Sequence, residues 1–265
     1  MKRRSCKYLL TAALLCAALT LPAKAARRRV PVQADAIPVS AAAYVEQGVT
    51  YVSLRALLNA LGSWQVWWDG EAGQAAAISG SASLRADPAG NVIRVNGIAL
   101  SGRVTVESGV TYVPLRLVCE ALGCKVEWDP YLGGAAVTSP GAAYDAGELY
   151  WLSRIIYAES GAESMTGQIA VGNVILNRME SSRFPNTVEG VIFDRKDAVQ
   201  FEPVSNGQIY KTPSAQSVEA ARRVLDGENV IGSALYFYAP ALSQGVWINA
   251  SCTYQQTIGC HRFYL

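Results

Sequence analysis

An internal repeat in the first half of the chain constrains its fold more than any other feature of the sequence. Residues 45–62 return as residues 106–123, with twelve of eighteen positions identical. Both copies continue into a Trp-Asp pair, at 68–69 and at 128–129. Such repetition means that one supersecondary unit is used twice and that the copies bury their apolar faces together. We therefore expect a duplicated unit around a shared core.

Turn and strand signals predict the same order of elements in each copy. A turn at Gly48 or Gly109 precedes a short β-branched strand. A helix of about eight residues follows, and Gly62 or Gly123 ends it as the C′ residue. A second strand that ends in Trp-Asp completes the unit. This order predicts a small α+β domain over residues 30–139.

Two stretches of the second copy carry a family resemblance. Val-Pro-Leu-Arg at 113–116 and Ala-Leu-Gly-Cys-Lys-Val-Glu-Trp-Asp at 121–129 resemble the stalk domain named after the N-terminal domain of copper amine oxidases. The region has no histidine and no cluster of soft ligands beyond its two cysteines, so we expect no metal there. Its tryptophans either bind glycan or fill the core, and the core is the favoured interpretation. The resemblance implies a spacer or surface-attachment module.

The first 25 residues have the composition of a secretory signal peptide. Residues 2–7 carry four basic side chains, residues 8–21 are fourteen mostly apolar residues, and residues 22–25 supply a small-x-small cleavage site. The apolar stretch is shorter than the roughly 20 residues that span a bilayer, which disfavours an uncleaved anchor. We therefore predict a secreted protein that meets the membrane only through this peptide.

The distribution of charge argues against a nucleic-acid partner. The formal net charge is +2, but the predicted signal peptide alone carries five basic residues. Residues 141–265 contain nine Lys and Arg against twelve Asp and Glu. A nucleic-acid-binding domain is expected to show a basic stripe, and apart from the short run at 27–29 this sequence has none.

The numbers of cysteines and histidines limit which disulfides and metal sites the chain can form. Four cysteines remain after the predicted signal peptide, and an even number in an exported chain favours two disulfides, Cys119–Cys124 and Cys252–Cys260. Four buried thiols are the alternative. The single histidine, His261, cannot supply the two or three imidazoles of a zinc amidase or endopeptidase. We therefore predict neither a metal nor a cofactor.

A Pro- and Gly-containing linker at 140–147 leads into a second domain at 148–265. Leu149, Leu152, Ile156 and Glu159 follow one another at steps of three, four and three, so they share one helical stripe. A carboxylate thus ends the face that should turn inward. Desolvation would raise its pKa and suit it to donate a proton to a glycosidic oxygen. Spacing alone leaves open a Glu that simply reaches solvent.

A series of motifs gives this region a specific resemblance. They lie in order at 155–163, 167–178, 184–192, 200–207, 234–237 and 258–264. The series resembles the SleB/CwlJ cell wall hydrolase family, which includes spore-cortex-lytic enzymes. The resemblance implies a lysozyme-related α+β domain that acts on peptidoglycan and is associated with the cell wall. We expect the protein to be a monomer. The resemblance also implies that Glu159, the first Glu of the family's Ala-Glu-x-x-x-Glu segment, is catalytic.

One departure from the family pattern concerns the acid itself. Family members commonly have Ala-Arg-Gly between the two glutamates, whereas this chain has Ser160-Gly161-Ala162. The change removes a possible positive neighbour and keeps both carboxylates. Glu159 therefore remains the expected catalytic residue, but the sequence does not define its pKa.

The preferred reaction is that of a lytic transglycosylase, which cleaves between N-acetylmuramic acid and N-acetylglucosamine with Glu159 as acid and base, because one well-placed acid is visible and a partner is not. A hydrolytic muramidase or glucosaminidase would need a second carboxylate, for which Glu163 and Glu202 are candidates. We expect Glu163 to have a structural role instead, anchoring the helix end or a backbone amide. A non-catalytic wall-binding protein is the alternative from another class, and the choice between vegetative wall and spore cortex stays open.

Several further side chains are weaker candidates for binding the glycan: Asn177, Gln200, Phe201, Asn206, Tyr236, Tyr238 and His261. Asn177 could hold a sugar acetamide or cap its helix. The polar loop could line a cleft, and the two tyrosines could stack on sugars or pack in the core. A Cys260–His261 protease is disfavoured, because adjacent residues on a strand point to opposite faces.

Overall fold

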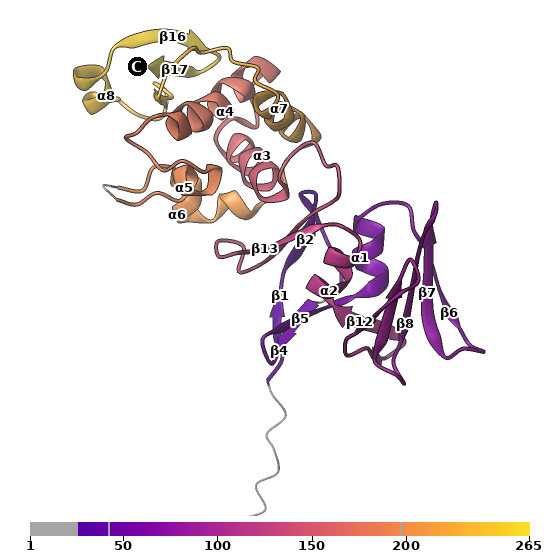
Figure 1. Cartoon of the computed structure of the whole chain (residues 1–265). Helices are drawn as coiled ribbons and strands as arrows, with labels where there is room; N and C mark the ends of the chain where they lie inside the picture. Colours follow the sequence, from indigo (N-terminus) through magenta and orange to yellow (C-terminus); the bar gives the residue numbers. More distant parts are fainter. Residues whose placement is uncertain (1–25, 42, 197) are drawn as a thin grey trace, which may run out of the picture.

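The computed structural model describes residues 26–41, 43–196 and 198–265, so the predicted signal peptide lies outside the described residues. These residues form a β-rich domain followed by a mainly helical domain with a small sheet (Figure 1). Both contain helices and strands, which confirms the predicted α+β class. Within the described ranges, no helix combines the length and the apolar character needed to cross a bilayer.

The two repeats meet in the central sheet of the first domain. Its order is β1 (Arg28–Val30), β4 (Ala43–Glu46), β5 (Val49–Ser53), β12 (Val110–Pro114) and β11 (Thr105–Glu107). Strands β5 and β12 pair antiparallel with Val52 opposite Val113, and these two residues occupy the same position in the repeat. An antiparallel pair centred on equivalent residues relates the two copies by an approximate twofold axis.

Two further sheets extend the copies outward. One has the order β10 (Ile98–Ser101), β9 (Val92–Val95), β8 (Ala82–Asp87), β7 (Gln74–Ser79) and β6 (Gln65–Asp69). The other has the order β13 (Lys125–Asp129), β14 (Gly134–Thr138), β2 (Val32–Ala34) and β3 (Ile37–Pro38), with β2 parallel to β14. Hairpins β6–β7 and β13–β14 are equivalent in the repeat. A continuous apolar core, including Leu57, Leu84 and Val118, lies among these sheets and helices.

The turn and helix-end predictions for the repeat are confirmed. Gly48 and Gly109 adopt φ values of 79° and 77° in the turns before β5 and β12. The helices that follow, α1 (Leu54–Ala60) and α2 (Leu115–Ala121), each have seven residues. Gly62 and Gly123 come after them with positive φ, the conformation that favours glycine at a helix end.

The expectation that the tryptophans of this domain fill the core holds for Trp64, which packs against it, and is wrong for the other three. Trp67, Trp68 and Trp128 are 40%, 48% and 45% exposed. They lie on β6 and β13, which are edge strands, and small side chains of the inner strands occupy the core beneath them. Because an edge strand has a neighbour on one side alone, its large side chains are covered less completely.

The second domain is built on three packed helices, α3 (Ala146–Ser160), α4 (Met165–Glu180) and α7 (Ala215–Leu225). Helix α3 begins within the predicted linker, because the Asp145 side chain accepts hydrogen bonds from the backbone N–H groups of Gly147 and Glu148. The remaining elements are α5 (Val188–Ile192), α6 (Glu202–Asn206), the 3₁₀ helix η1 (Gln208–Tyr210), α8 (Val246–Ser251), and a sheet of β15 (Tyr236–Tyr238), β17 (His261–Tyr264) and β16 (Tyr254–Ile258).

The β13–β14 hairpin joins the two domains (Figure 1). Trp151 of α3 is fully buried and donates a hydrogen bond from Nε1 to Oδ2 of Asp129, at 2.7 Å. The ring of Tyr131 stacks on Phe193, with centroids 4.0 Å apart and 5° between the planes. Lys125 Nζ lies 2.9 Å from Asp145 Oδ2. The helical domain is therefore docked on the repeat through a buried hydrogen bond, an aromatic stack and an exposed ion pair.

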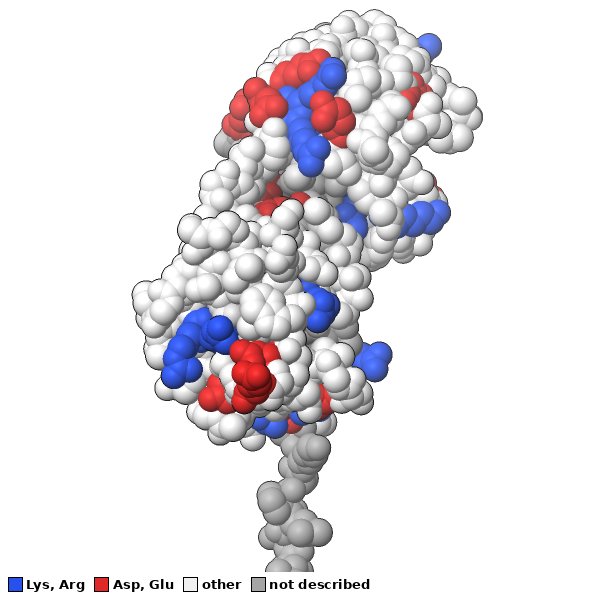
Figure 2. Space-filling model, turned by 90° about the vertical axis from the view of Figure 1, so that its right-hand side faces the viewer, with Lys and Arg blue, Asp and Glu red and all other residues white. Residues whose placement is uncertain are grey.

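Charged side chains on the face shown in Figure 2 form small clusters in which both signs occur. Such clusters lie on both domains, with white surface between them. On that face, neither sign gathers into a continuous stripe. Long-range attraction of a strongly charged partner is therefore weak there, because opposite charges close together cancel at a distance.

The four cysteines of the described residues are free thiols, so neither predicted disulfide is present. Cys252 precedes β16 and Cys260 follows it, so a strand of five residues separates them. At about 3.3 Å per residue this is roughly 16 Å, beyond the Cα separation of about 7 Å that a disulfide tolerates. Cys119 and Cys124 do lie together, with Cys124 N–H bonded to Cys119 O at 2.8 Å, but as buried thiols.

Candidate active site

A pocket of about 480 Å³ opens at the C-terminal end of α3. Residues 157–163 form one wall, and the others come from η1 and the residue after it, from the loop after β15, and from the β16–β17 turn with the start of β17. The lining residues outside 157–163 are Gln208, Lys211, Ala239, Leu242, Cys260 and His261. The pocket therefore brings together three of the predicted site residues, Glu159, Glu163 and His261.

Glu159 lies in the last turn of α3, at the end of a stripe whose Leu152 and Ile156 are fully buried. Its carboxyl group is partly buried beside the pocket. Desolvation, with a smaller contribution from the negative charge of Glu202, raises the pKa of Glu159 to about 7. A carboxylic acid with such a pKa is protonated in about half of the molecules at neutral pH, so it can both donate a proton and recover it.

Glu202 supplies the charge that acts on Glu159. It is the first residue of α6 and is exposed. It is not among the residues that line the pocket. The sequence marked Glu202 as one candidate for a second carboxylate, and the electrostatic effect places it close enough to influence the acid.

Glu163 contacts the β16–β17 turn through its carboxylate. Its Oε1 accepts a hydrogen bond from the Cys260 backbone N–H at 3.4 Å and from the Cys260 thiol at 2.7 Å. Gly259, with φ of 57°, lies against Oε2 so closely that a Cβ there would collide with it. These contacts favour the structural role expected for Glu163, in which it anchors a backbone amide.

His261 is buried and lies beside Cys260, with Sγ and Nδ1 3.8 Å apart. The expectation that the two side chains point to opposite faces is wrong. Cys260 belongs to the turn before β17 and not to the strand, so strand alternation does not apply to it. The His261 ring meets Phe237 edge to face at 5.3 Å, and burial lowers its pKa.

Asn177 does not line the pocket. Its Nδ2 donates to the carbonyl oxygens of Gly232 and Ala234, both at 2.8 Å, and its Oδ1 accepts from Asn229. The side chain thus fixes the loop before β15 to helix α4. This role differs from both sequence interpretations, the sugar contact and the helix cap.

The remaining predicted binding residues also lie outside the pocket lining. Phe201 is 2% exposed in the core, and Gln200 accepts a hydrogen bond from the buried Arg178 at 3.3 Å. Asn206 closes a local turn by accepting from Gln208 N–H. Tyr236 packs edge to face on Phe184 and Trp247, and Tyr238 is hydrogen-bonded to Asn249.

Sequence reasoning missed several lining residues. Tyr157 lies in the first motif, but no feature of the sequence distinguishes its ring from a core residue. Gln208 and Lys211 follow the fourth motif, and the chain brings them to the pocket through η1, whose Ile209 is buried. No local signal marks Ala239 or Leu242, since their position depends on how the loop after β15 returns over the helices.

The raised pKa predicts how activity depends on pH. Above about pH 7 the protonated fraction of Glu159 falls, and a step that needs its proton slows by about tenfold per pH unit. Glu202→Gln removes one of the two causes of the shift, so the alkaline limb of kcat/KM should move to lower pH. Rates on soluble glycan fragments at a series of pH values measure this. If the alkaline limb stays at the same pH in this variant, Glu202 does not contribute to the pH dependence.

Two family profiles match separate parts of the chain. The copper amine oxidase N-terminal domain matches residues 32–136, and the family described as Cell Wall Hydrolase matches residues 162–264. The second domain is a cell wall hydrolase domain. The copper of the first family's name does not fit the donors here, because residues 32–136 hold no histidine and their two thiols, Cys119 and Cys124, are buried.

Curated relatives of the cell wall hydrolase domain have names from spore biology. The chain is 39% identical over 105 residues to a spore cortex-lytic enzyme of Bacillus cereus, which covers 40% of this chain and 39% of that protein. It is 35% identical over 113 residues to the spore cortex-lytic enzyme of Bacillus subtilis, covering 43% and 36%. The chain thus spans about two fifths of the length of these relatives.

Two further similarities involve shorter proteins. The cell wall hydrolase CwlJ of Oceanobacillus iheyensis is 28% identical over 103 residues, which is 37% of this chain and 72% of that protein. Among solved structures, the catalytic domain of the germination-specific lytic transglycosylase SleB from Bacillus anthracis is 36% identical. It covers 48% of this chain and 99% of that domain, with a TM-score of 0.43.

Proposed function

We propose that the protein is an exported enzyme that degrades peptidoglycan by cleaving glycan strands between N-acetylmuramic acid and N-acetylglucosamine. The observation that carries the proposal is Glu159, a partly buried acid whose pKa is raised to about 7 beside a pocket of a cell wall hydrolase domain. Such a pKa suits one group that must first give and then take a proton near neutral pH.

The proposed reaction is lytic transglycosylation with Glu159 as both acid and base. Protonated Glu159 gives its proton to the glycosidic oxygen, and the bond from that oxygen to C1 of the muramic residue breaks. The resulting carboxylate takes the proton of the muramic 6-hydroxyl, whose oxygen closes onto C1. The products are a 1,6-anhydro end and a free hydroxyl, and Glu159 regains its starting form without consuming water.

Hydrolysis is the second candidate reaction, and one observation bears on it. A hydrolase needs a second carboxylate for a water molecule or a covalent intermediate. Glu163 is engaged with Cys260, whereas Glu202 influences Glu159 electrostatically. If water is the acceptor, Glu202 is therefore the better partner. A non-catalytic wall-binding protein would have no need of an acid with so high a pKa.

Mass spectrometry of the soluble fragments distinguishes these reactions. Purified peptidoglycan is digested with the chain lacking its predicted signal peptide. We expect 1,6-anhydro-muramic ends. Reducing ends would instead establish hydrolysis and require the second carboxylate, and an absence of fragments from every wall preparation would favour the binding protein.

The proposed substrate is spore cortex, and germination is the proposed setting. The names of the Bacillus relatives support this choice. Parallel digestion of cortex and vegetative wall tests it, because cortex-directed activity should release more fragments from cortex per unit of glycan. Equal release of fragments from cortex and from vegetative wall would contradict the proposed role in germination. It would not affect the proposal about which glycosidic bond is cleaved.

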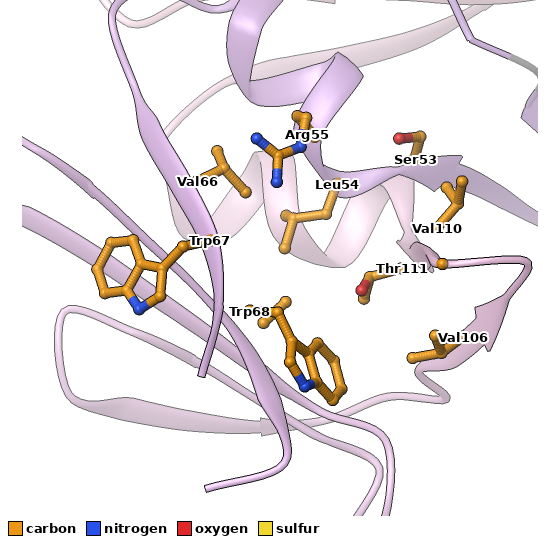
Figure 3. A pocket seen from close by; sticks show the side chains of 11 residues that line it. Ser53, Leu54, Arg55, Val66, Trp67, Trp68, Val106, Val110 and Thr111 are labelled. Atoms are coloured by element: carbon orange, nitrogen blue, oxygen red, sulfur yellow. The ribbon is translucent and has the colours of Figure 1, made fainter. Parts of the chain in front are cut away.

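For the first domain we propose contact with the glycan through its exposed tryptophans. A pocket of about 410 Å³ lies between β6 and the turn before β12, with Arg55 and Trp68 in its lining (Figure 3). Figure 3 shows the Trp68 ring directed toward Thr111 and Val106 across the pocket. An exposed indole can stack on a sugar face, and a guanidinium in the same pocket can pair with a carboxylate.

The repeat supplies a second pocket of the same construction. It has about 280 Å³ and is lined by Arg116 and Trp128, which are the repeat equivalents of Arg55 and Trp68. Each pocket takes its tryptophan from one copy and its turn from the other: Gly109 in the first and Gly48 in the second. The twofold relation of the copies thus yields two related surfaces.

Loss of both exposed indoles should weaken binding to insoluble wall. We expect Trp68→Ala with Trp128→Ala to lower affinity in a pelleting assay by about 30-fold, because each stacked ring contributes on the order of 1 kcal/mol. Ile98→Ala is the matched control, since Ile98 is 67% exposed in the same domain and lines neither pocket. Equal losses in the control and the double variant would contradict glycan contact.

A further inference from the structure

The rim of the active-site pocket carries a cluster of three different metal-binding side chains. A carboxylate oxygen of Glu163, the Sγ of Cys260 and a ring nitrogen of His261 all lie within 4.8 Å of one another. Their exposure decreases from the thiol, which is exposed, to the carboxylate and then to the buried imidazole. All three line the same pocket as Glu159.

The fold places these ligands with little freedom to move apart. Glu163 lies between α3 and α4, where its backbone carbonyl accepts hydrogen bonds from Gln168 and Gln216. The other two residues lie at the β16–β17 turn, and Gly259 lets that turn approach the carboxylate directly. Two segments nearly a hundred residues apart, as Glu163 and Cys260 are, therefore converge on one point.

The separations fit a small tetrahedral ion. Zinc binds sulfur at about 2.3 Å and nitrogen or oxygen at about 2.0–2.2 Å, which puts neighbouring ligand atoms roughly 3.3–3.6 Å apart. Sγ lies 3.8 Å from Nδ1 of His261 and 2.7 Å from Oε1 of Glu163. Movements of less than about 1 Å, within the reach of a carboxylate rotation, would bring these two pairs to the ideal spacing.

We propose that Glu163, Cys260 and His261 bind a zinc ion at the rim of the pocket. A thiolate, an imidazole and a carboxylate together match a borderline-soft ion, whereas calcium and magnesium prefer oxygen ligands. Binding replaces the thiol proton, which leaves to solvent, and the Cys260–Glu163 hydrogen bond. Three protein ligands leave a fourth position for water. This site differs from that of a zinc amidase because it holds a single imidazole.

The position of the site predicts an effect on the enzyme, and this part rests on the proposed function. An ion with its water at the rim occupies space that a glycan strand needs in order to reach Glu159. Zinc should therefore inhibit glycan cleavage, and a chelator should restore it. The binding of zinc itself can be measured without any activity, so failure of one part is distinguishable from failure of the other.

The test titrates Zn²⁺ into the chain lacking its predicted signal peptide and follows binding by calorimetry, with bound metal counted by mass spectrometry. Cys119→Ser and Cys124→Ser are present throughout, because this buried thiol pair offers zinc a second location. We expect about one tight equivalent, with affinity reduced at least about 100-fold by Cys260→Ser, since even the loss of an outer partner costs 10–100-fold. Cys252→Ser is the matched control and should bind as the parent does.

A second measurement leaves the cluster intact and so does not depend on whether a variant folds. Cys260 is exposed and should react with iodoacetamide, and bound Zn²⁺ should protect it. Cys252, which is outside the cluster, should react equally with and without the ion. Tight binding that survives Cys260→Ser, an absence of binding, or alkylation of Cys260 that zinc does not slow would each overturn the site.

Discussion

Glu159→Gln is expected to lower the rate of glycan cleavage by about 10²–10⁴-fold, the usual contribution of a positioned general acid or base. The amide keeps the size of the side chain but can neither give a proton to the glycosidic oxygen nor take one from the 6-hydroxyl. Release of soluble fragments from purified peptidoglycan measures the effect. The yield of 1,6-anhydro ends should fall by the same factor as the rate.

Stability measurements show whether such a loss is chemical. The pKa of Glu159 is raised above that of an unfolded Glu, so the folded state disfavours its charged form. The resulting penalty is absent below about pH 4.5, grows as the pH rises toward 7 and is complete above it. Glu159→Gln removes this penalty, so at pH 8 the variant should unfold at the same temperature as the parent or a higher one.

Glu148→Gln is the matched control for this substitution. Glu148 lies in the first turn of the same helix, and burial also raises its pKa, but it does not line the pocket. Its amide should retain cleavage close to the parent rate. Equal losses in the two variants, or full activity of Glu159→Gln, would remove Glu159 from the catalytic role.

The sequence predicted features that depend on local rules. The repeat, its turns at Gly48 and Gly109 and its helix ends follow from residue types a few positions apart. The helical stripe likewise placed Glu159 at the inward end of α3. These predictions hold because neighbouring residues determine backbone conformation and the direction of side chains along a helix.

Features that depend on distant contacts could not be read from the sequence. The pairing predicted for Cys252 and Cys260 is wrong because a strand occupies the interval between them and keeps them apart. The exposed tryptophans follow from the edge positions of β6 and β13, which no local pattern reveals. The approach of Glu163 to the β16–β17 turn joins residues 97 apart in the sequence.

A substitution that breaks the buried contact between the domains is expected to lower the stability of the protein strongly. Asp129 Oδ2 accepts the Trp151 indole N–H, and Oδ1 accepts the backbone N–H groups of Tyr131 and Leu132 at 2.9 Å each. Asp129→Ala leaves the buried indole N–H without its acceptor, which costs about 1–3 kcal/mol, and also loosens the hairpin that carries Tyr131. We expect about 3 kcal/mol in total and a Tm lower by roughly 6–12 °C.

The repeat itself provides the control for this substitution. Asp69 is the equivalent of Asp129 and accepts the Ala72 N–H in the same kind of turn, but it pairs with Arg85 within its own domain. Asp69→Ala should therefore shift Tm less and leave the domains coupled. Asp129→Asn keeps an oxygen acceptor for Trp151 and should recover part of the loss.

Thermal unfolding followed by tryptophan fluorescence and far-UV circular dichroism measures all three variants. If docking is what Asp129 provides, its alanine variant alone should unfold in two separate transitions, whereas equal shifts at both positions would reduce its role to that of a turn residue.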